Sequence, residues 1–225
     1  MSTFAVAPVK TLLKSKTRLS AFFAPQERRL LTLAMLQDVL DALKSSKVNK
    51  TAVISSDPTV QRFVKDFDVT YLKETREGLN QALEQAIKWC IRKGAESVLF
   101  LPADVPLITP NDINQITKLA LNNSAVISPS RNGGTNALLQ TPPRIIAPCF
   151  GSDSFKKHVS QALAKHVQTK IYVSSSVMLD IDSEKDLELL LKSGKETVSY
   201  RFLKQSAWSK ADYSLLSGKL EVSLG

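Results

Sequence analysis

The chain has 225 residues, 43% of them hydrophobic, and carries a formal net charge of +9 from 30 basic and 21 acidic residues. This length suits one domain with a full core, and no apolar run approaches the length of a membrane span. The first ten residues lack the features of a signal peptide, so we expect a cytoplasmic protein. Cys90 and Cys149 match no metal spacing and are predicted to be free thiols.

Strand-like and helix-like segments alternate along the chain, which predicts an α/β protein with a mostly parallel central sheet between two helical layers. Residues 1–195 form the predicted domain, and residues 196–225 a C-terminal arm or dimer contact. The predicted strands are Phe4–Val9, Thr51–Ser55, Val69–Leu72, Ser97–Leu101, Ala125–Ser128, Ala137–Leu139 and Lys170–Val173. The predicted helices are Pro25–Leu43, Glu77–Lys93, one opening at Thr109, Ser154–Lys165 and Ser183–Leu191.

A basic loop follows the first predicted strand and holds Lys10, Lys14, Lys16 and Arg18. At the carboxyl end of a strand these charges could surround a polyphosphate, with lysine as a point charge and arginine as a bidentate fork. Taken alone, the loop is interpreted more simply as a solvated basic surface. The sequence has neither a Gly-rich P-loop nor a G-x-G-x-x-G motif, which disfavours the standard NTPase and Rossmann folds.

Asp104 lies between two prolines, Pro102 and Pro106, directly after the buried strand Ser97–Leu101. Open α/β sheets place their ligands beyond the carboxyl ends of central strands. The prolines stiffen the turn that holds the acid. The position predicts that Asp104 belongs to a functional site.

A second acidic pair, Asp180 and Asp182, flanks Ile181. In an extended segment both carboxylates point to one face, where they repel each other unless a cation lies between them. Magnesium prefers oxygen ligands and bridges carboxylates to substrate phosphates. Together with Asp104 the pair is predicted to form a magnesium site. Alternatively, the two acids favour the dipole of the helix that starts at Ser183.

Three further segments could contact anions or a nucleotide. In Gly133–Thr135, adjacent glycines could point their N–H groups at an anion and Thr135 could add a hydroxyl, or the segment could be a plain hairpin turn. Gly151 and Ser154 lie at a helix start, which suits phosphate, although a capping serine beside a surface His158 is an alternative. Gly78 and Asn80, at another helix start, could hold a nucleotide's sugar or base, or form a cap.

These segments occur in order over about residues 5–190 and resemble the CofC family of 2-phospho-L-lactate guanylyltransferases, which serve coenzyme F-420 biosynthesis. The resemblance is most specific in the runs L-P-A-D-V-P and G-G-T-N-A-L-L. The matching segments are Pro8–Lys10, Lys16–Leu19, Gly78–Asn80, Leu101–Pro106, Ser128–Arg131, Gly133–Leu139, Phe150–Gly151, Ser154–Phe155, His158 and Leu179–Asp182.

The resemblance implies a three-layer nucleotidyltransferase fold like that of the molybdenum-cofactor guanylyltransferases. It implies transfer of GMP from GTP to 2-phospho-L-lactate with release of diphosphate. From the residues themselves we also expect a possible homodimer and neither a nucleic-acid nor a membrane partner. The implied roles are catalysis by Lys16, Arg18 and Asp104; nucleotide binding by Lys10, Lys16, Arg18, Gly78 and Asn80; acid binding by Thr135, Gly151 and Ser154; and Mg²⁺ binding by Asp104, Asp180 and Asp182.

Other functions stay open at this stage. Phosphoenolpyruvate or 3-phosphoglycerate could replace 2-phospho-L-lactate, since pockets separate such similar molecules by only ~1–3 kcal/mol. Acid-x-acid pairs also bind metal in sugar-nucleotide glycosyltransferases, but the basic loop and the proline-flanked Asp104 disfavour that function. The positive charge would suit a nucleic-acid-binding protein, yet the sequence lacks an aromatic RNA-binding signature and zinc-finger spacing.

Overall fold

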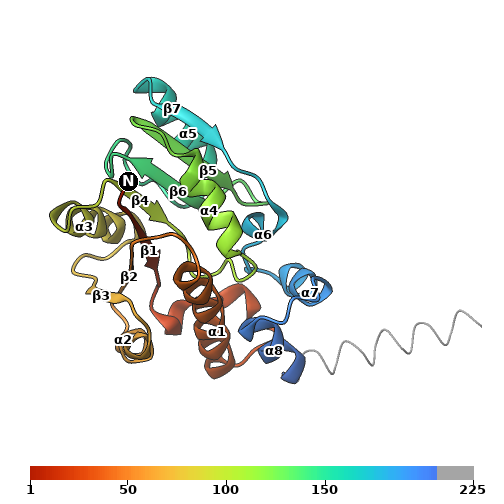
Figure 1. Cartoon of the computed structure of the whole chain (residues 1–225). Coiled ribbons are helices and arrows are strands. Elements are labelled where there is room, and N and C mark those ends of the chain that lie inside the picture. Colours follow the sequence, from red (N-terminus) through yellow and green to blue (C-terminus); the bar gives the residue numbers. More distant parts are fainter. Residues whose placement is uncertain (207–225) are drawn as a thin grey trace, which may run out of the picture.

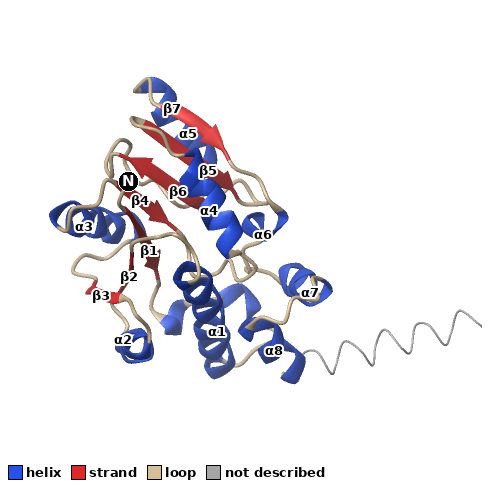
Figure 2. Cartoon of the chain, in the orientation of Figure 1, coloured by secondary structure: helices blue, strands red, loops and turns tan. Residues whose placement is uncertain are grey.

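A computed structural model describes residues 1–206 and shows one seven-stranded sheet in the order β3-β2-β1-β4-β6-β5-β7. Of these strands, β6 runs antiparallel to both of its neighbours, and the other pairings are parallel. The predicted α/β class with a mostly parallel sheet is thus confirmed (Figure 2). The strands are β1 Thr3–Pro8, β2 Lys50–Ser55, β3 Thr70–Lys73, β4 Ser97–Phe100, β5 Ser124–Pro129, β6 Thr135–Thr141 and β7 Gln168–Ile171.

Helices cover both faces of the sheet (Figure 1). Helices α1, α2 and α4 pack on one face, and α3 and α5 on the other. None of the helices in the described range combines the length and apolar character needed to cross a bilayer. The helices are α1 Pro25–Lys44, α2 Pro58–Phe63, α3 Leu79–Arg92, α4 Pro110–Leu119, α5 Ser154–Ala164, α6 Ser175–Met178, α7 Glu184–Lys192 and α8 Val198–Gln205.

Strand β1 shows why the central strands read as continuous apolar runs. Phe4 and Val6 face the layer of α3 and α5, whereas Ala5 and Ala7 face the layer of α1. All four side chains are buried. A strand covered on both faces needs apolar residues at every position, so it lacks the alternation of a half-exposed strand.

A third core cluster lies beyond the sheet, where α7 and α8 pack with α1. Leu31 and Met35 of α1 contact this cluster, which also contains Leu187 and Leu203. Helix α8 falls in the segment predicted as a C-terminal arm and is docked on the domain. The rest of that segment, residues 207–225, lies outside the described residues.

The buried Asp38 of α1 fastens the start of α8. Its carboxylate accepts hydrogen bonds from the N–H groups of Val198 (2.6 Å) and Ser199 (3.0 Å) and from the Ser199 hydroxyl (2.5 Å). These bonds satisfy N–H groups that the first turn of a helix leaves unpaired. Asp38 thus acts as a cap supplied by a distant helix.

Replacing Asp38 by alanine is expected to lower the free energy of unfolding by about 1–3 kcal/mol, because it leaves buried donors of α8 without an acceptor. Asp41→Ala is the matched control, since Asp41 lies nearly one turn further along α1 and is exposed. Urea unfolding of both variants measures the difference. Equal stability of the two variants would show that α8 is held by its apolar contacts alone.

Candidate active site

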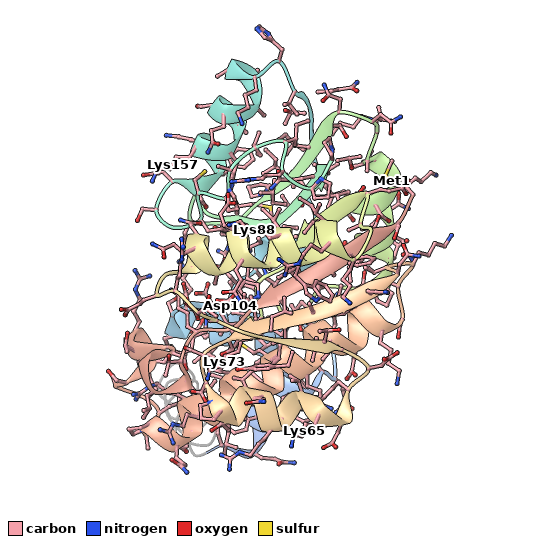
Figure 3. All side chains as sticks on the ribbon, turned by 90° about the vertical axis from the view of Figure 1, so that its left-hand side faces the viewer. Met1, Lys65, Lys73, Lys88, Asp104 and Lys157 are labelled. Carbon is pink, nitrogen blue, oxygen red and sulfur yellow. The ribbon has the colours of Figure 1, made fainter. Side chains whose placement is uncertain are left out.

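A cavity of about 550 Å³ lies at the carboxyl ends of β1 and β4. Its walls come from the basic loop after β1, the Asp104 loop after β4, the β5–β6 turn, the start of α5 and the acidic segment before α7. Figure 3 shows Asp104 near the middle of the molecule, with α5, which carries Lys157, above it. The antiparallel β6 brings the β5–β6 turn to this edge of the sheet.

Most of the predicted site residues meet in this cavity. Gly78 and Asn80 are not among its lining residues, although Leu79 between them is. The Asn80 amide instead bonds to the backbone of Phe150, as acceptor from its N–H (2.8 Å) and as donor to its carbonyl (3.1 Å). The predicted residues in the lining are Lys10, Lys16, Arg18, Asp104, Thr135, Gly151, Ser154, Asp180 and Asp182.

The backbone of the basic loop turns Lys16 inward. Lys16 has φ 50° and ψ 39°, a left-handed conformation that is uncommon outside glycine. Buried Leu12 and Leu19 anchor the loop on either side, and the Leu12 N–H donates to Asp57 at 2.9 Å. The side chain of Lys16 is consequently only 6% exposed.

The Lys16 ammonium bridges two carboxylates from distant parts of the chain. Its Nζ lies 2.8 Å from Asp104 Oδ2 and 2.8 Å from Asp182 Oδ1. Burial alone would lower the pKa of Lys16, but the two acids outweigh it and raise that pKa. Burial would raise the pKa of Asp182, yet the charge of Lys16 outweighs it and holds that pKa below its usual range. Lys16 and Asp182 are therefore both charged at neutral pH.

Asp180 lies beside this bridge and has no cationic partner among the described residues. Its Oδ1 accepts a hydrogen bond of 3.3 Å from the Asn136 amide, which also donates to the Val177 carbonyl at 2.8 Å. Burial raises the pKa of Asp180, and the negative charge of Asp104 raises it further. A cation between these carboxylates would relieve that repulsion.

A backbone hydrogen bond joins the two acidic segments: the Ile181 N–H donates to the Asp104 carbonyl at 3.0 Å. Ile181 is fully buried in the cluster formed with α7 and α8. Asp180 and Asp182 both line the cavity, as the predicted alternation around Ile181 requires. The Asp186 carboxylate accepts the Ser183 N–H at 2.9 Å and caps α7.

The two glycines before β6 shape a turn in another part of the cavity wall. The Gly134 N–H donates to Ser130 Oγ (2.9 Å) and the Gly133 N–H to the Ser130 carbonyl (3.4 Å), so the prediction that these groups point at an anion is wrong. A Cβ on Gly134 would lie 2.8 Å from Ser130 Oγ, which explains the glycine. Thr135, together with Gly151 and Ser154 at the positive end of α5, lines the cavity here.

His158 is fully buried, so its interpretation as a surface histidine is wrong. Its Nδ1 lies 2.9 Å from the Thr135 hydroxyl, and its Nε2 accepts a hydrogen bond from the Cys149 N–H at 3.1 Å. The Phe150 ring packs edge-on against the imidazole at 4.9 Å between centroids. Burial lowers the pKa of His158 to about 4, so the imidazole is neutral at neutral pH.

Acid is expected to destabilise the protein through His158, whose pKa of about 4 lies below the value of about 6.5 for an unfolded chain. Its contribution is complete above pH 6.5 and is lost as the pH falls toward 4, because the unfolded state then binds one more proton. From pH 7 to pH 5 the wild type should lose about 2 kcal/mol more than His158→Asn. Urea unfolding at both pH values measures this, and equal losses would contradict it.

A model of the family described as "Guanylyl transferase CofC like" matches residues 3–223. The chain belongs to the CofC guanylyltransferase family. The match extends past residue 196 and includes α8, which the resemblance noted from the sequence did not cover. Members of the CofC family are nucleotidyltransferases, so this chain is an enzyme of that class.

Curated CofC relatives cover nearly the whole chain. A phosphoenolpyruvate guanylyltransferase from Rubrobacter xylanophilus is 40% identical over 203 residues, which cover 89% of this chain and 98% of the relative. A 2-phospho-L-lactate guanylyltransferase from Methanobrevibacter ruminantium is 34% identical over 232 residues, which cover 98% of this chain and 97% of the relative. A solved nucleotidyl transferase from Methanothermobacter thermautotrophicus superposes with a TM-score of 0.64 at 14% identity, and the match covers 91% of this chain and 99% of that one. This likeness shows the nucleotidyltransferase fold.

The acidic side chains of this CofC chain fit a magnesium ion that arrives with phosphates. Within residues 1–206, no three His, Cys, Asp or Glu side chains are grouped as they would be around a bound metal. Lys16 joins Asp104 and Asp182 instead. Magnesium, however, is usually held by one or two carboxylates while phosphates and water fill its other positions. The all-oxygen donors and the uncompensated Asp180 therefore suit this ion.

Two contributors to the site could not be assigned from the sequence. Asn136 orients Asp180, and His158 contacts Thr135. Both lie in segments that carry the CofC resemblance, but neither spacing nor residue type indicated a role. Their partners are 44 and 23 residues away, respectively, and only the fold brings them together.

Proposed function

We propose that this protein transfers GMP from GTP to 2-phospho-L-lactate and releases diphosphate, as a step of coenzyme F-420 biosynthesis. One observation carries the proposal: the lining of a single cavity contains two chemically unlike groups of residues, which we call its two ends. The first end holds Lys10, Lys16 and Arg18 with the carboxylates, and the second holds the hydroxyl groups of Thr135 in β6 and Ser154 in α5. The first end suits a metal-bound triphosphate, and the second suits one phosphate group.

The reaction needs no general base from the protein. A phosphate oxygen of the acid attacks the α-phosphorus of GTP, and the bond from that phosphorus to the oxygen bridging the α and β phosphates breaks. Diphosphate leaves with this oxygen and its electron pair. Since the attacking oxygen is already anionic, no proton has to be removed. Such a route agrees with the neutral, buried His158.

The protein's contribution is positioning and charge compensation. Asp104, Asp180 and Asp182 would hold Mg²⁺, which neutralises phosphate charge when bound. Lys16 and Arg18 would compensate the charge that develops on the leaving diphosphate. Thr135, Gly151 and Ser154 would hold the phosphate of the acid in line with the α-phosphorus.

Phosphoenolpyruvate is a second candidate acceptor. The R. xylanophilus relative, at 40% identity, is named for that acid, whereas the relatives named for 2-phospho-L-lactate reach 33–35%. The two acids carry the same carboxylate and phosphate and differ at one carbon–carbon bond. The lining of the acid end gives no reason to separate them, so both acids enter the test.

Diphosphate release tests the proposal. Each of the four NTPs is combined with 2-phospho-L-lactate, phosphoenolpyruvate, 3-phosphoglycerate or a sugar phosphate, with and without Mg²⁺. Release that needs GTP, Mg²⁺ and 2-phospho-L-lactate supports the proposal, and preference for phosphoenolpyruvate makes that acid the substrate. Equal turnover with sugar phosphates, or none with any three-carbon acid, would overturn it.

We also propose a cytoplasmic location. The two cysteines are free thiols, which suits a reducing compartment. A homodimer stays a prediction that sedimentation analysis can test.

A further inference from the structure

The hydrogen bonds around His158 determine which of its nitrogens carries the proton. Nε2 accepts the Cys149 N–H, so Nε2 carries no proton itself. A neutral imidazole has one N–H, which must then be on Nδ1. Nδ1 therefore donates to the Thr135 hydroxyl, 2.9 Å away.

This arrangement in turn orients the Thr135 hydroxyl. Its oxygen accepts from Nδ1, and it has no other side-chain hydrogen bond in the described part of the chain. Thr135 lines the cavity at the end formed with Gly151 and Ser154. The hydroxyl proton is consequently available to a ligand in that cavity. In the opposite tautomer, Nδ1 would accept a hydrogen bond from the Thr135 hydroxyl. The hydroxyl would then present only its oxygen lone pairs to the ligand, and these repel an anion.

We propose that His158 is a positioning residue that makes Thr135 a hydrogen-bond donor toward the phosphate of the acid substrate. The inference deepens the proposed function and rests on its assignment of the acid to this end of the cavity. His158 does not touch the substrate and transfers no proton. It orients the Thr135 hydroxyl as a hydrogen-bond donor, and this orientation favours a ligand atom that can only accept a hydrogen bond, such as a phosphate oxygen. The pKa of His158, lowered by burial to about 4, keeps this arrangement unchanged across the physiological range.

Two amide substitutions separate the two hydrogen bonds of His158. His158→Asn places an amide group at the position of Nδ1, so it can still donate to Thr135 but cannot reach the Cys149 N–H. His158→Gln places an amide oxygen at the position of Nε2, so it accepts from Cys149 but leaves Thr135 without its donor. The two variants have similar polarity and are matched controls for each other.

In steady-state kinetics, His158→Gln should raise KM for the acid about tenfold or more, with a smaller change in kcat and an unchanged KM for GTP. His158→Asn should keep KM for the acid within about threefold of wild type. In a Thr135→Val background, His158→Gln should cause no further rise. Equal effects of both amides, or an equal rise in KM for GTP, would overturn the inference.

Imidazole ¹⁵N NMR tests the inference independently of turnover, and its first measurement needs no variant. The wild-type protein at pH 7 should show His158 neutral with its proton on Nδ1, and a proton on Nε2 would overturn the inference. Titration with inorganic phosphate should perturb this signal, and Thr135→Val should weaken phosphate binding. If no three-carbon acid is a substrate but both results hold, the proposed function has failed and the positioning role stands for an anion of another kind.

Discussion

Asp104→Asn and Asp182→Asn are each expected to lower turnover at least a hundredfold while the fold survives. An amide removes the charge that would hold Mg²⁺ and that orients Lys16 at 2.8 Å. Loss of one preorganised electrostatic contact commonly costs about 2.7–4 kcal/mol in the barrier. The fold should survive because the backbone bond between Asp104 and Ile181 does not involve either side chain.

The measurement is the rate of diphosphate release over a range of Mg²⁺ concentrations, together with thermal unfolding. Asp66→Asn, at an exposed position outside the cavity lining, is the control. Near-normal rates at limiting Mg²⁺ would show that the substituted acid only favours the α7 dipole or pairs with Lys16. The two residues are tested separately, because Asp182 precedes a helix and Asp104 does not.

Lys16→Ala and Ser154→Ala should separate the two ends of the cavity. Lys16→Ala should mainly impair the use of GTP, because it removes the ammonium from the end proposed to bind the triphosphate and leaves two carboxylates facing one another. Ser154→Ala should raise KM for the phosphorylated acid far more than KM for GTP, because Ser154 belongs to the hydroxyl-lined end at the start of α5. Removing one hydrogen bond to a charged group costs about 1.5–3 kcal/mol, roughly a ten- to hundredfold change.

Kinetics with each substrate varied in turn distinguish the two variants. Lys65→Ala serves as a control for the loss of a positive charge, since Lys65 is exposed and away from the cavity lining (Figure 3). A reversed pattern would mean that GTP and the acid occupy the opposite ends, even though the reaction itself is named correctly.

The sheet was predictable because its central strands are buried on both faces. Strand β4 shows this clearly, because the apolar run Ser97–Leu101 predicted a strand between the turn at Gly94 and Pro102. The strand is observed at Ser97–Phe100. At the edge of the sheet, β7 is half-exposed and its register is less constrained by burial. The strand was predicted at Lys170–Val173 and lies at Gln168–Ile171.

Which residues line the cavity was also largely predictable, whereas the contacts among them were not. Charged residues after strand ends indicated Asp104 and the basic loop, because parallel strands place their carboxyl ends together. The bridge from Lys16 to Asp182 spans 166 residues and depends on a left-handed backbone that local sequence preferences disfavour. The same holds for His158, whose burial comes from the packing of α5 on the sheet.

Two of the carboxylates that line the cavity lie outside the seven-stranded sheet. Within residues 1–206 every strand ends by residue 171. Asp180 and Asp182 lie in a later segment, which one backbone hydrogen bond joins to the Asp104 loop and which the packing of α7 and α8 supports. Segments with few backbone bonds open at lower free energy than core strands. Heat or denaturant should therefore inactivate the enzyme before its sheet unfolds. Loss of activity should precede the far-UV circular dichroism transition. Amide hydrogens of residues 180–205 should exchange faster than those of β1 and β4.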